Sequence, residues 1–124
     1  MLSIDATLER LAGGATPYKA AARVVATSSI TLSGLQTIDG VALQAGDRVL
    51  YAASSSVDSG LWVARAGQWE RPVDFAVDKF IKLGCLVPVL AGTVNAKSLW
   101  MMTTTGAVTL GTTAMTFEKL SQVA

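Results

Sequence analysis

Apolar and polar positions follow two patterns along this chain, and the change falls near residue 21. In the first stretch, IDATLERLAGG, Ile4, Leu8 and Leu11 fall on one face of a helix of roughly two turns that Gly13 and Gly14 would end. So short a helix is marginal alone, so it either packs on its own domain or forms an arm that docks on a neighbour. The candidate contact residues of this arm, residues 1–20, are Leu8, Leu11 and Tyr18.

Residues 21–124 have the pattern of short β-strands. Segments rich in β-branched and alternating apolar residues recur at roughly 8–12-residue spacing, with turn residues between them. The segments are ARVVATSSITL, QTIDGVAL, DRVLYA, LWVARA, WERP, CLVPVLAG, SLWMMTTT and, near the end, AVTL or AMTFEKL. We therefore expect an all-β domain, a small β-sandwich or barrel of short antiparallel strands.

Three local features refine this pattern. Gly67 and Gln68 separate LWVARA from WERP and predict a tight hairpin. Pro88, inside CLVPVLAG, predicts an edge strand or a bulge, because proline cannot donate to a sheet ladder. The segment RPVDFAVDKFIKLG is ambiguous between a helix and an irregular crossing segment, and its β-branched and aromatic content favours the irregular form. The candidate helical face is Val73, Val77, Phe80 and Ile81.

Composition adds an expectation of assembly. The chain has 124 residues, the size of one domain, and 51% of them are hydrophobic. Only 15% are charged, against about 25% in typical soluble proteins. No apolar run reaches the roughly 18 residues of a membrane helix, so protein rather than lipid is expected to cover the excess apolar surface. The net charge of +1, without a basic cluster, argues against nucleic-acid binding.

Candidate catalytic groups are few. The chain has no histidine, no zinc-type cluster and no phosphate-binding glycine loop, so we expect no enzyme and no cofactor. Cys85 is flanked by apolar residues and is expected to be a reduced core thiol. Glu70, Asp74 and Asp78, spaced by four, could act as paired acids on a sugar if they shared a helical face. The alternative is a solvated polar edge beside neighbouring basic residues, and we favour it.

The three tryptophans have two interpretations. Trp62, Trp69 and Trp100 could form a platform on which sugar rings stack, or they could anchor a small β core. Trp62 and Trp69 flank the predicted hairpin, where cross-strand contact is plausible. We favour the core interpretation.

The aspartate and glycine pairs are typical of turns. Asp39–Gly40 and Gly46–Asp47 each predict a turn in which glycine takes a positive φ. Asp47 is expected to accept backbone amides, and Arg48 to pair with it or to reach across the sheet. A calcium site at Asp39, Asp47 and Asp58 is the rival interpretation, but it would need more clustered oxygens.

The order of these motifs resembles a module of tailed-bacteriophage virion proteins, chiefly tail fibres and related appendages. The matching segments are TIDGV at 37–41, AGDRVL at 45–50, SGLWV at 59–63 with Gly60 and Trp62, and GQWER at 67–71 with Trp69 and Arg71. Further along the chain they are Asp74, GTVN at 92–95, Trp100, LGTT at 110–113 and Phe117. Ser59 stands where the family usually has asparagine, which puts any contact of the preceding polar loop in doubt.

The resemblance implies a non-enzymatic structural protein of the virion, made in the host cytoplasm. The expected role is tail-associated, as a fibre, baseplate or adaptor component. Its expected partners are itself, as a homotrimer, and other virion proteins. The resemblance assigns Gly60, Trp62, Trp69, Arg71 and Trp100 to the framework. One alternative is a capsid decoration (cement) protein, and another is a carbohydrate-binding module that recognises a host surface glycan.

Overall fold

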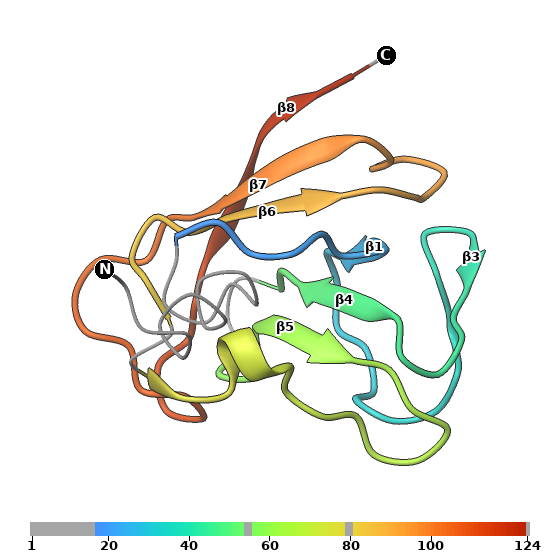
Figure 1. Ribbon diagram of the computed structural model, residues 1–124, viewed down its shortest axis with the longest axis horizontal. Helices are drawn as coiled ribbons and strands as arrows, with labels where there is room; N and C mark the ends of the chain where they lie inside the picture. The colour runs from blue at the N-terminus through green and yellow to red at the C-terminus, as the bar shows by residue number, and fades with distance from the viewer. Residues whose placement is uncertain (1–16, 54–55, 79–80, 124) are drawn as a thin grey trace, which may run out of the picture.

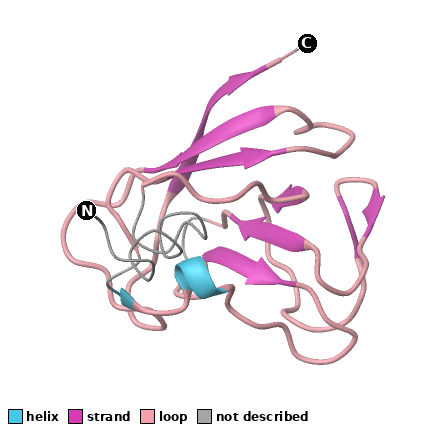
Figure 2. Ribbon diagram, viewed as in Figure 1, coloured by secondary structure: helices cyan, strands magenta, loops and turns pink. Residues whose placement is uncertain are grey.

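The computed structural model describes residues 17–53, 56–78 and 81–123, which form three small sheets (Figures 1 and 2). The first has the order β1-β4-β5, with β1 at Val24–Ala26, β4 at Arg48–Tyr51 and β5 at Gly60–Val63. The second is the hairpin of β2 (Thr37–Ile38) and β3 (Val41–Ala42). The third has the order β6-β7-β8, with β6 at Leu86–Val89, β7 at Ser98–Met102 and β8 at Phe117–Gln122. The all-β prediction is confirmed, and the described sheets do not close into a barrel.

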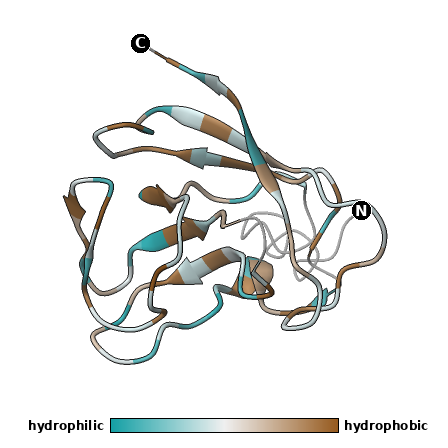
Figure 3. Ribbon diagram, turned by 180° about the vertical axis from the view of Figure 1, so that it is seen from behind, coloured by the Kyte–Doolittle hydropathy of each residue, from teal (hydrophilic) through white to brown (hydrophobic). Residues whose placement is uncertain are grey.

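The β1-β4-β5 sheet is the central layer and is buried on both faces. Val25, Leu50 and Leu61 lie side by side across it and pack toward the β6-β7-β8 sheet, in a cluster with Phe75 and Met102. The opposite face carries a second core cluster, which is closed by β2, β3 and the loops around them. Its buried members are Val24, Ala26, Ile38, Leu43, Val49, Tyr51, Ala64 and Trp69. Because both faces are covered, β1 is apolar throughout and β4 is apolar after Arg48, rather than alternating, as Figure 3 shows for β1.

One strand pair differs from the antiparallel prediction. β1 and β4 are parallel, with Val25 opposite Leu50. A parallel pair needs a long crossover, and the chain between Ala26 and Arg48 supplies it by carrying the β2–β3 hairpin around the end of the sheet. The pairs β4–β5, β6–β7 and β7–β8 are antiparallel, as expected.

The segment before β1 links the two larger sheets. Tyr18 pairs in parallel with Leu86 and Ala22 with Val89, at the outer edge of β6. The amide of Ala22 donates to the carbonyl of Pro88 (2.8 Å). Pro88 therefore lies on an edge strand of its sheet, as predicted. Proline has no N–H to donate, and at an edge this costs the sheet no hydrogen bond between central strands.

The expected arm, residues 1–20, lies mostly outside the described residues. This includes Leu8, Leu11 and the predicted helix. Tyr18, its third candidate contact residue, is described and pairs with β6, as does Lys19, whose amide donates to the carbonyl of Leu86 (2.9 Å). The described part of the domain thus begins at Pro17 or earlier, whereas the expected boundary between arm and domain was at residue 21.

Two local predictions have different outcomes. The tight hairpin at Gly67 and Gln68 is wrong, because Val63 pairs with Glu70 and six residues lie between them. This wider loop allows Trp69 to turn into the second core cluster. The irregular form of the 71–84 segment is confirmed in its described part, where a single 3-10 turn, η1 (Val73–Phe75), is the named element.

Candidate functional site

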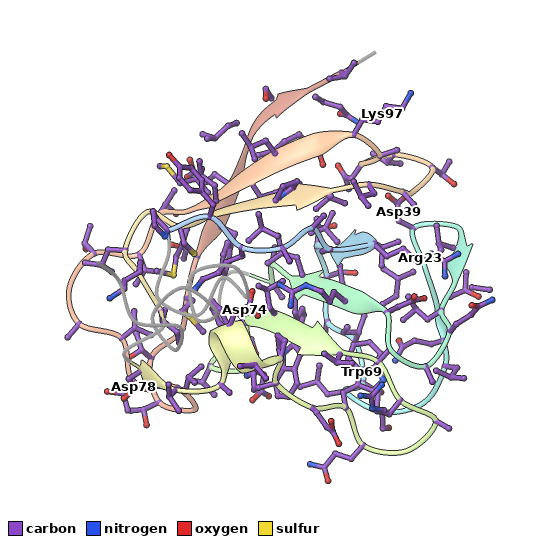
Figure 4. All side chains as sticks on the ribbon, in the orientation of Figure 1. Arg23, Asp39, Trp69, Asp74, Asp78 and Lys97 are labelled. Carbon is purple, nitrogen blue, oxygen red and sulfur yellow. The ribbon has the colours of Figure 1, made fainter. Side chains whose placement is uncertain are left out.

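The most developed polar arrangement begins at the turn between β2 and β3. Asp39 and Gly40 form the two-residue loop of this hairpin, with φ values of 48° and 77°. Both values are in the left-handed region, which Asp-Gly pairs favour in such loops. The predicted turn is therefore present. Figure 4 shows Asp39 at the tip of the hairpin, next to the connection between β6 and β7.

This turn holds a loop that is more than 50 residues away in the sequence. The carboxylate of Asp39 accepts hydrogen bonds from the amides of Val94 (3.0 Å) and Asn95 (2.9 Å). The Asp39 carbonyl accepts a third from the amide of Thr93 (2.8 Å). Three backbone donors that would otherwise need water are thus satisfied by one residue, and the hairpin is fixed to the β6–β7 connection.

The two glycines of this contact, Gly40 and Gly92, leave no room for a side chain. A Cβ on Gly40 would meet the Thr93 hydroxyl, and a Cβ on Gly92 would meet the Asp39 carboxylate. Gly92 has a φ of 132°, which also disfavours other residues. We call this set, Asp39, Gly40, Gly92, Thr93 and Asn95, the Asp39 junction.

The second predicted turn, Gly46–Asp47, is also present. Gly46 has a φ of 96°, and the Asp47 carboxylate accepts the amide of Gln44 (2.8 Å), as predicted. The cation beside Asp47 is Arg23, at 2.6 Å, and not its neighbour Arg48.

Arg48 instead reaches the other side of β4. Its two terminal nitrogens donate to the two carboxylate oxygens of Asp74, each at 2.9 Å, and one also donates to the carbonyl of Ala20 (3.0 Å). Successive side chains of a strand point to opposite faces, so Asp47 and Arg48 diverge. Arg48 therefore does not pair with Asp47, the first role expected for it, and contacts Asp74 of η1 and the Ala20 carbonyl instead.

The three carboxylates proposed as sugar-cleaving acids do not share a face. Asp74 is only 2% exposed and is neutralised by Arg48, so the favoured alternative of a solvated polar edge is also wrong for it. Asp78 accepts the amide of Leu110 and lies away from Asp74 in Figure 4. Glu70 is exposed and faces Arg65 at 3.6 Å. The segment does not form the helix that would have aligned them.

Arg71 stabilises the turn before β5. Its guanidinium donates to the carbonyls of Leu61 (3.0 Å) and Ser59 (3.1 Å) and stacks over Trp62, 3.9 Å from the ring centroid. Burial lowers the pKa of Arg71 to about 10, so the side chain is still a cation at neutral pH. A Cβ on Gly60 would collide with Phe75, which explains the glycine there.

The tryptophans do not form a sugar platform. Trp69 is 2% exposed and Trp100 7%, and the indole N–H groups donate to the Gly34 carbonyl and the Ser98 hydroxyl, respectively. Trp62 is half-buried and already stacked by Arg71. A stacking surface needs exposed rings, so the core interpretation is confirmed for Trp69 and Trp100.

Two further ionisable groups, Cys85 and Lys19, lie in the interior. Cys85 is buried in the larger core cluster, and burial raises its pKa to about 11, so the thiol stays protonated. Burial lowers the pKa of Lys19, and the charge of Asp74 opposes that shift. Among the described residues, no group of three or more His, Cys, Asp or Glu side chains could hold a metal ion. No helix within the same residues is long and apolar enough to cross a membrane.

Two surface hollows adjoin these contacts. One, of about 290 Å³, lies beside Asp39 and is lined partly by Thr27, Thr37 and Ile38. The other, of about 400 Å³, is lined partly by Arg48 and Arg71. The charged groups at both are engaged within the chain: Asp39 by amides, Arg48 by Asp74, and Arg71 by carbonyls. Each of these groups therefore helps to hold the fold in place.

Sequence reasoning missed several of these contacts, including the pairing of Asp47 with Arg23. It found Asp39 as a turn residue, but not its bonds to Val94 and Asn95, and it did not pair Arg48 with Asp74. The motifs themselves held a signal, because Asp39, Asn95, Arg48 and Asp74 all belong to the segments that carry the resemblance. No family model matches this chain, and comparisons with curated proteins and with solved structures likewise give no match.

Proposed function

We propose that this chain is a non-enzymatic structural component of a tailed-phage virion. Its place is the tail, as part of a fibre, a baseplate or an adaptor. It acts by assembling with itself, as a homotrimer, and with other virion proteins.

The observation that carries this proposal is the Asp39 junction. The resemblance rests on separate motifs, among them TIDGV at 37–41 and GTVN at 92–95. In the fold these two motifs meet, since Asp39 accepts the amides of Val94 and Asn95. Motif residues that bind one another are expected where a sequence signature describes a framework. A signature of catalysis would instead direct polar groups toward a substrate.

The other motif residues have the same character. Arg48 and Asp74 form an ion pair with the carboxylate buried, Arg71 bonds backbone carbonyls, and Trp69 and Trp100 lie in the two core clusters. The polar motif residues of this domain stabilise its own fold. Its outer surface is therefore available for contacts with other proteins. This supports a building block over an enzyme.

The test is to purify the particles of the phage whose genome encodes the chain and to quantify the chain by mass spectrometry. The proposal expects a fixed copy number per particle and, when the gene is deleted, tails that lack a component and adsorb poorly. Deletion that leaves the tail intact but weakens the head would favour capsid decoration. Absence of the chain from purified particles would refute the proposal.

A further inference from the structure

The β6-β7-β8 sheet has apolar residues on the face turned away from the core. On β6, Val87 and Val89 are buried, so Leu86 and Pro88 point outward. On β7, Trp100 is buried between two neighbours that are only partly covered. Figure 1 shows this sheet above the β1-β4-β5 layer, so the outward side is the one away from that layer.

These outward residues form one continuous patch. Leu86 lies opposite Met101, Pro88 opposite Leu99, and Tyr18 pairs with Leu86 on the other side. Tyr18 is 68% exposed and Leu90, the next alternate position of β6, is 62% exposed. We call this patch the outer face; its members are Tyr18, Leu86, Pro88, Leu90, Leu99 and Met101. On β8 the residues opposite Met101 and Leu99 are Glu118 and Ser121, which give the patch a polar border.

An antiparallel sheet with one face in water normally has polar residues on that face. β6 and, after Ser98, β7 are apolar on both faces, which is typical of strands that are covered on both sides. In the single copy described, Tyr18 and Leu90 of the outer face are more than half exposed. Contiguous exposed apolar surface of this kind marks a site of protein contact.

The chain that precedes Pro17 is the candidate occupant of this face. They join the described chain at Pro17, whose carbonyl accepts the amide of Leu86 at the border of the outer face (2.8 Å). Their sequence predicts a helix with Ile4, Leu8 and Leu11 along one side. Nine helical residues span about 14 Å, and the four residues of β6 span about 13 Å. The apolar stripe therefore matches the face in length and in chemistry.

We infer that the outer face binds the N-terminal segment, residues 1–16, of a second copy of this chain. With nine residues helical and seven extended, the segment reaches up to roughly 37 Å, enough to cross to a neighbour. Exchange of such segments between copies is a common route to closed assemblies. This docking names the surface through which copies of the chain would self-assemble. Its biological role rests on the proposed function.

The experiment measures self-association of the purified full-length chain by sedimentation velocity. Leu99→Asp on the outer face and Leu8→Asp on the segment should each raise the dissociation constant roughly tenfold to a hundredfold, since each places a charge where an apolar side chain is buried. Val73→Asp is the matched control, because Val73 is exposed and lies outside the outer face; it should leave association unchanged. Far-ultraviolet circular dichroism checks that each variant is folded.

A crosslinking arm separates a second copy from the same copy. Copies with Leu8→Cys are mixed with copies of different mass that carry Leu99→Cys, and the native thiol of Cys85 is buried. The inference expects a disulfide-linked pair of the two masses. A link that forms only within a single chain carrying both cysteines would overturn it, as would a monomeric full-length protein. A chain that self-associates as expected but is absent from virions would refute the proposed function alone.

Discussion

Arg48 and Asp74 form a two-bond ion pair across 26 residues of sequence, with both oxygen–nitrogen distances at 2.9 Å. The pair connects β4 to η1, and Arg48 also holds the carbonyl of Ala20. It thereby joins the segment before β1, the central sheet and the 71–84 crossing. One guanidinium thus contacts three parts of the chain.

Asp74→Ala is expected to destabilise the domain by about 3 kcal/mol, because it leaves the mostly buried Arg48 cation without its counter-charge. Urea unfolding measures the change. Glu70→Ala is the matched control: Glu70 faces Arg65 at the surface, and exposed pairs contribute at most about 1 kcal/mol. Equal effects of the two substitutions would contradict the structural role of Asp74.

Asp39→Ala should cost roughly 2–4 kcal/mol, since the amides of Val94 and Asn95 lose their acceptor. Asp39→Asn should cost less, because asparagine tolerates the left-handed conformation and keeps one acceptor oxygen. Chemical denaturation gives both values. Glu118→Ala, at an exposed carboxylate of β8, serves as the control and should be close to neutral. A neutral Asp39→Ala would show that the junction does not hold the loop.

Gly40→Val should destabilise the domain by roughly 1–3 kcal/mol through backbone strain, with a further cost from the collision with Thr93. Comparing Gly92→Ala with Gly106→Ala separates these two effects. Both glycines have positive φ, but a Cβ on Gly92 meets Asp39, whereas a Cβ on Gly106 meets nothing within 4 Å. Gly92→Ala should therefore lower the melting temperature more than Gly106→Ala. The opposite order would count against the close contact at the junction.

Two truncations test where the domain begins. Removal of residues 1–16 should leave stability nearly unchanged and reduce self-association. Removal of residues 1–20 should cost at least about 2 kcal/mol more, because it deletes the bonds of Pro17 and Lys19 to Leu86 and the Ala20 carbonyl that binds Arg48. Thermal unfolding of both truncates provides the comparison. An unfolded 1–16 truncate would show that this segment belongs to the core.

Stability should decrease in alkali because of Cys85. Burial raises the pKa of its thiol from about 9 to about 11, so the folded state holds the proton more tightly than the unfolded chain. This contribution is complete below pH 9 and is lost as the pH rises toward 11, a change of about 2–3 kcal/mol. Burial of Lys19 lowers its pKa and acts with the opposite sign. Cys85→Ala keeps Lys19, so its free energy of unfolding should decline less than that of the wild type over this range.

The all-β class and the turns could be predicted because their signals are local. Asp39–Gly40 specifies a two-residue hairpin loop by its own backbone preferences, and Pro88 restricts its strand to an edge for the same kind of reason. The parallel pairing of Val25 with Leu50 could not be predicted, since it depends on where a 21-residue connection returns the chain. The same limit applies to the polar contacts.

For the polar contacts, the type of a residue indicated what kind of bond it would form, but the sequence did not indicate its partner. Asp47 was expected to accept a local amide and does so, because Gln44 is three residues away. Its cation, Arg23, is 24 residues away, and the partner of Arg48 is 26 away. The spacing of Glu70, Asp74 and Asp78 was misleading because it presumed a helix, and the packing of Phe75 and Asp74 into the interior favours an irregular path instead.

The most direct test of the proposed virion role is a cryo-electron microscopy map of the native particle. The account predicts density into which this domain fits at symmetric positions on the tail, with copies in contact across the outer face. A particle in which every part of the tail is accounted for without this domain would contradict it.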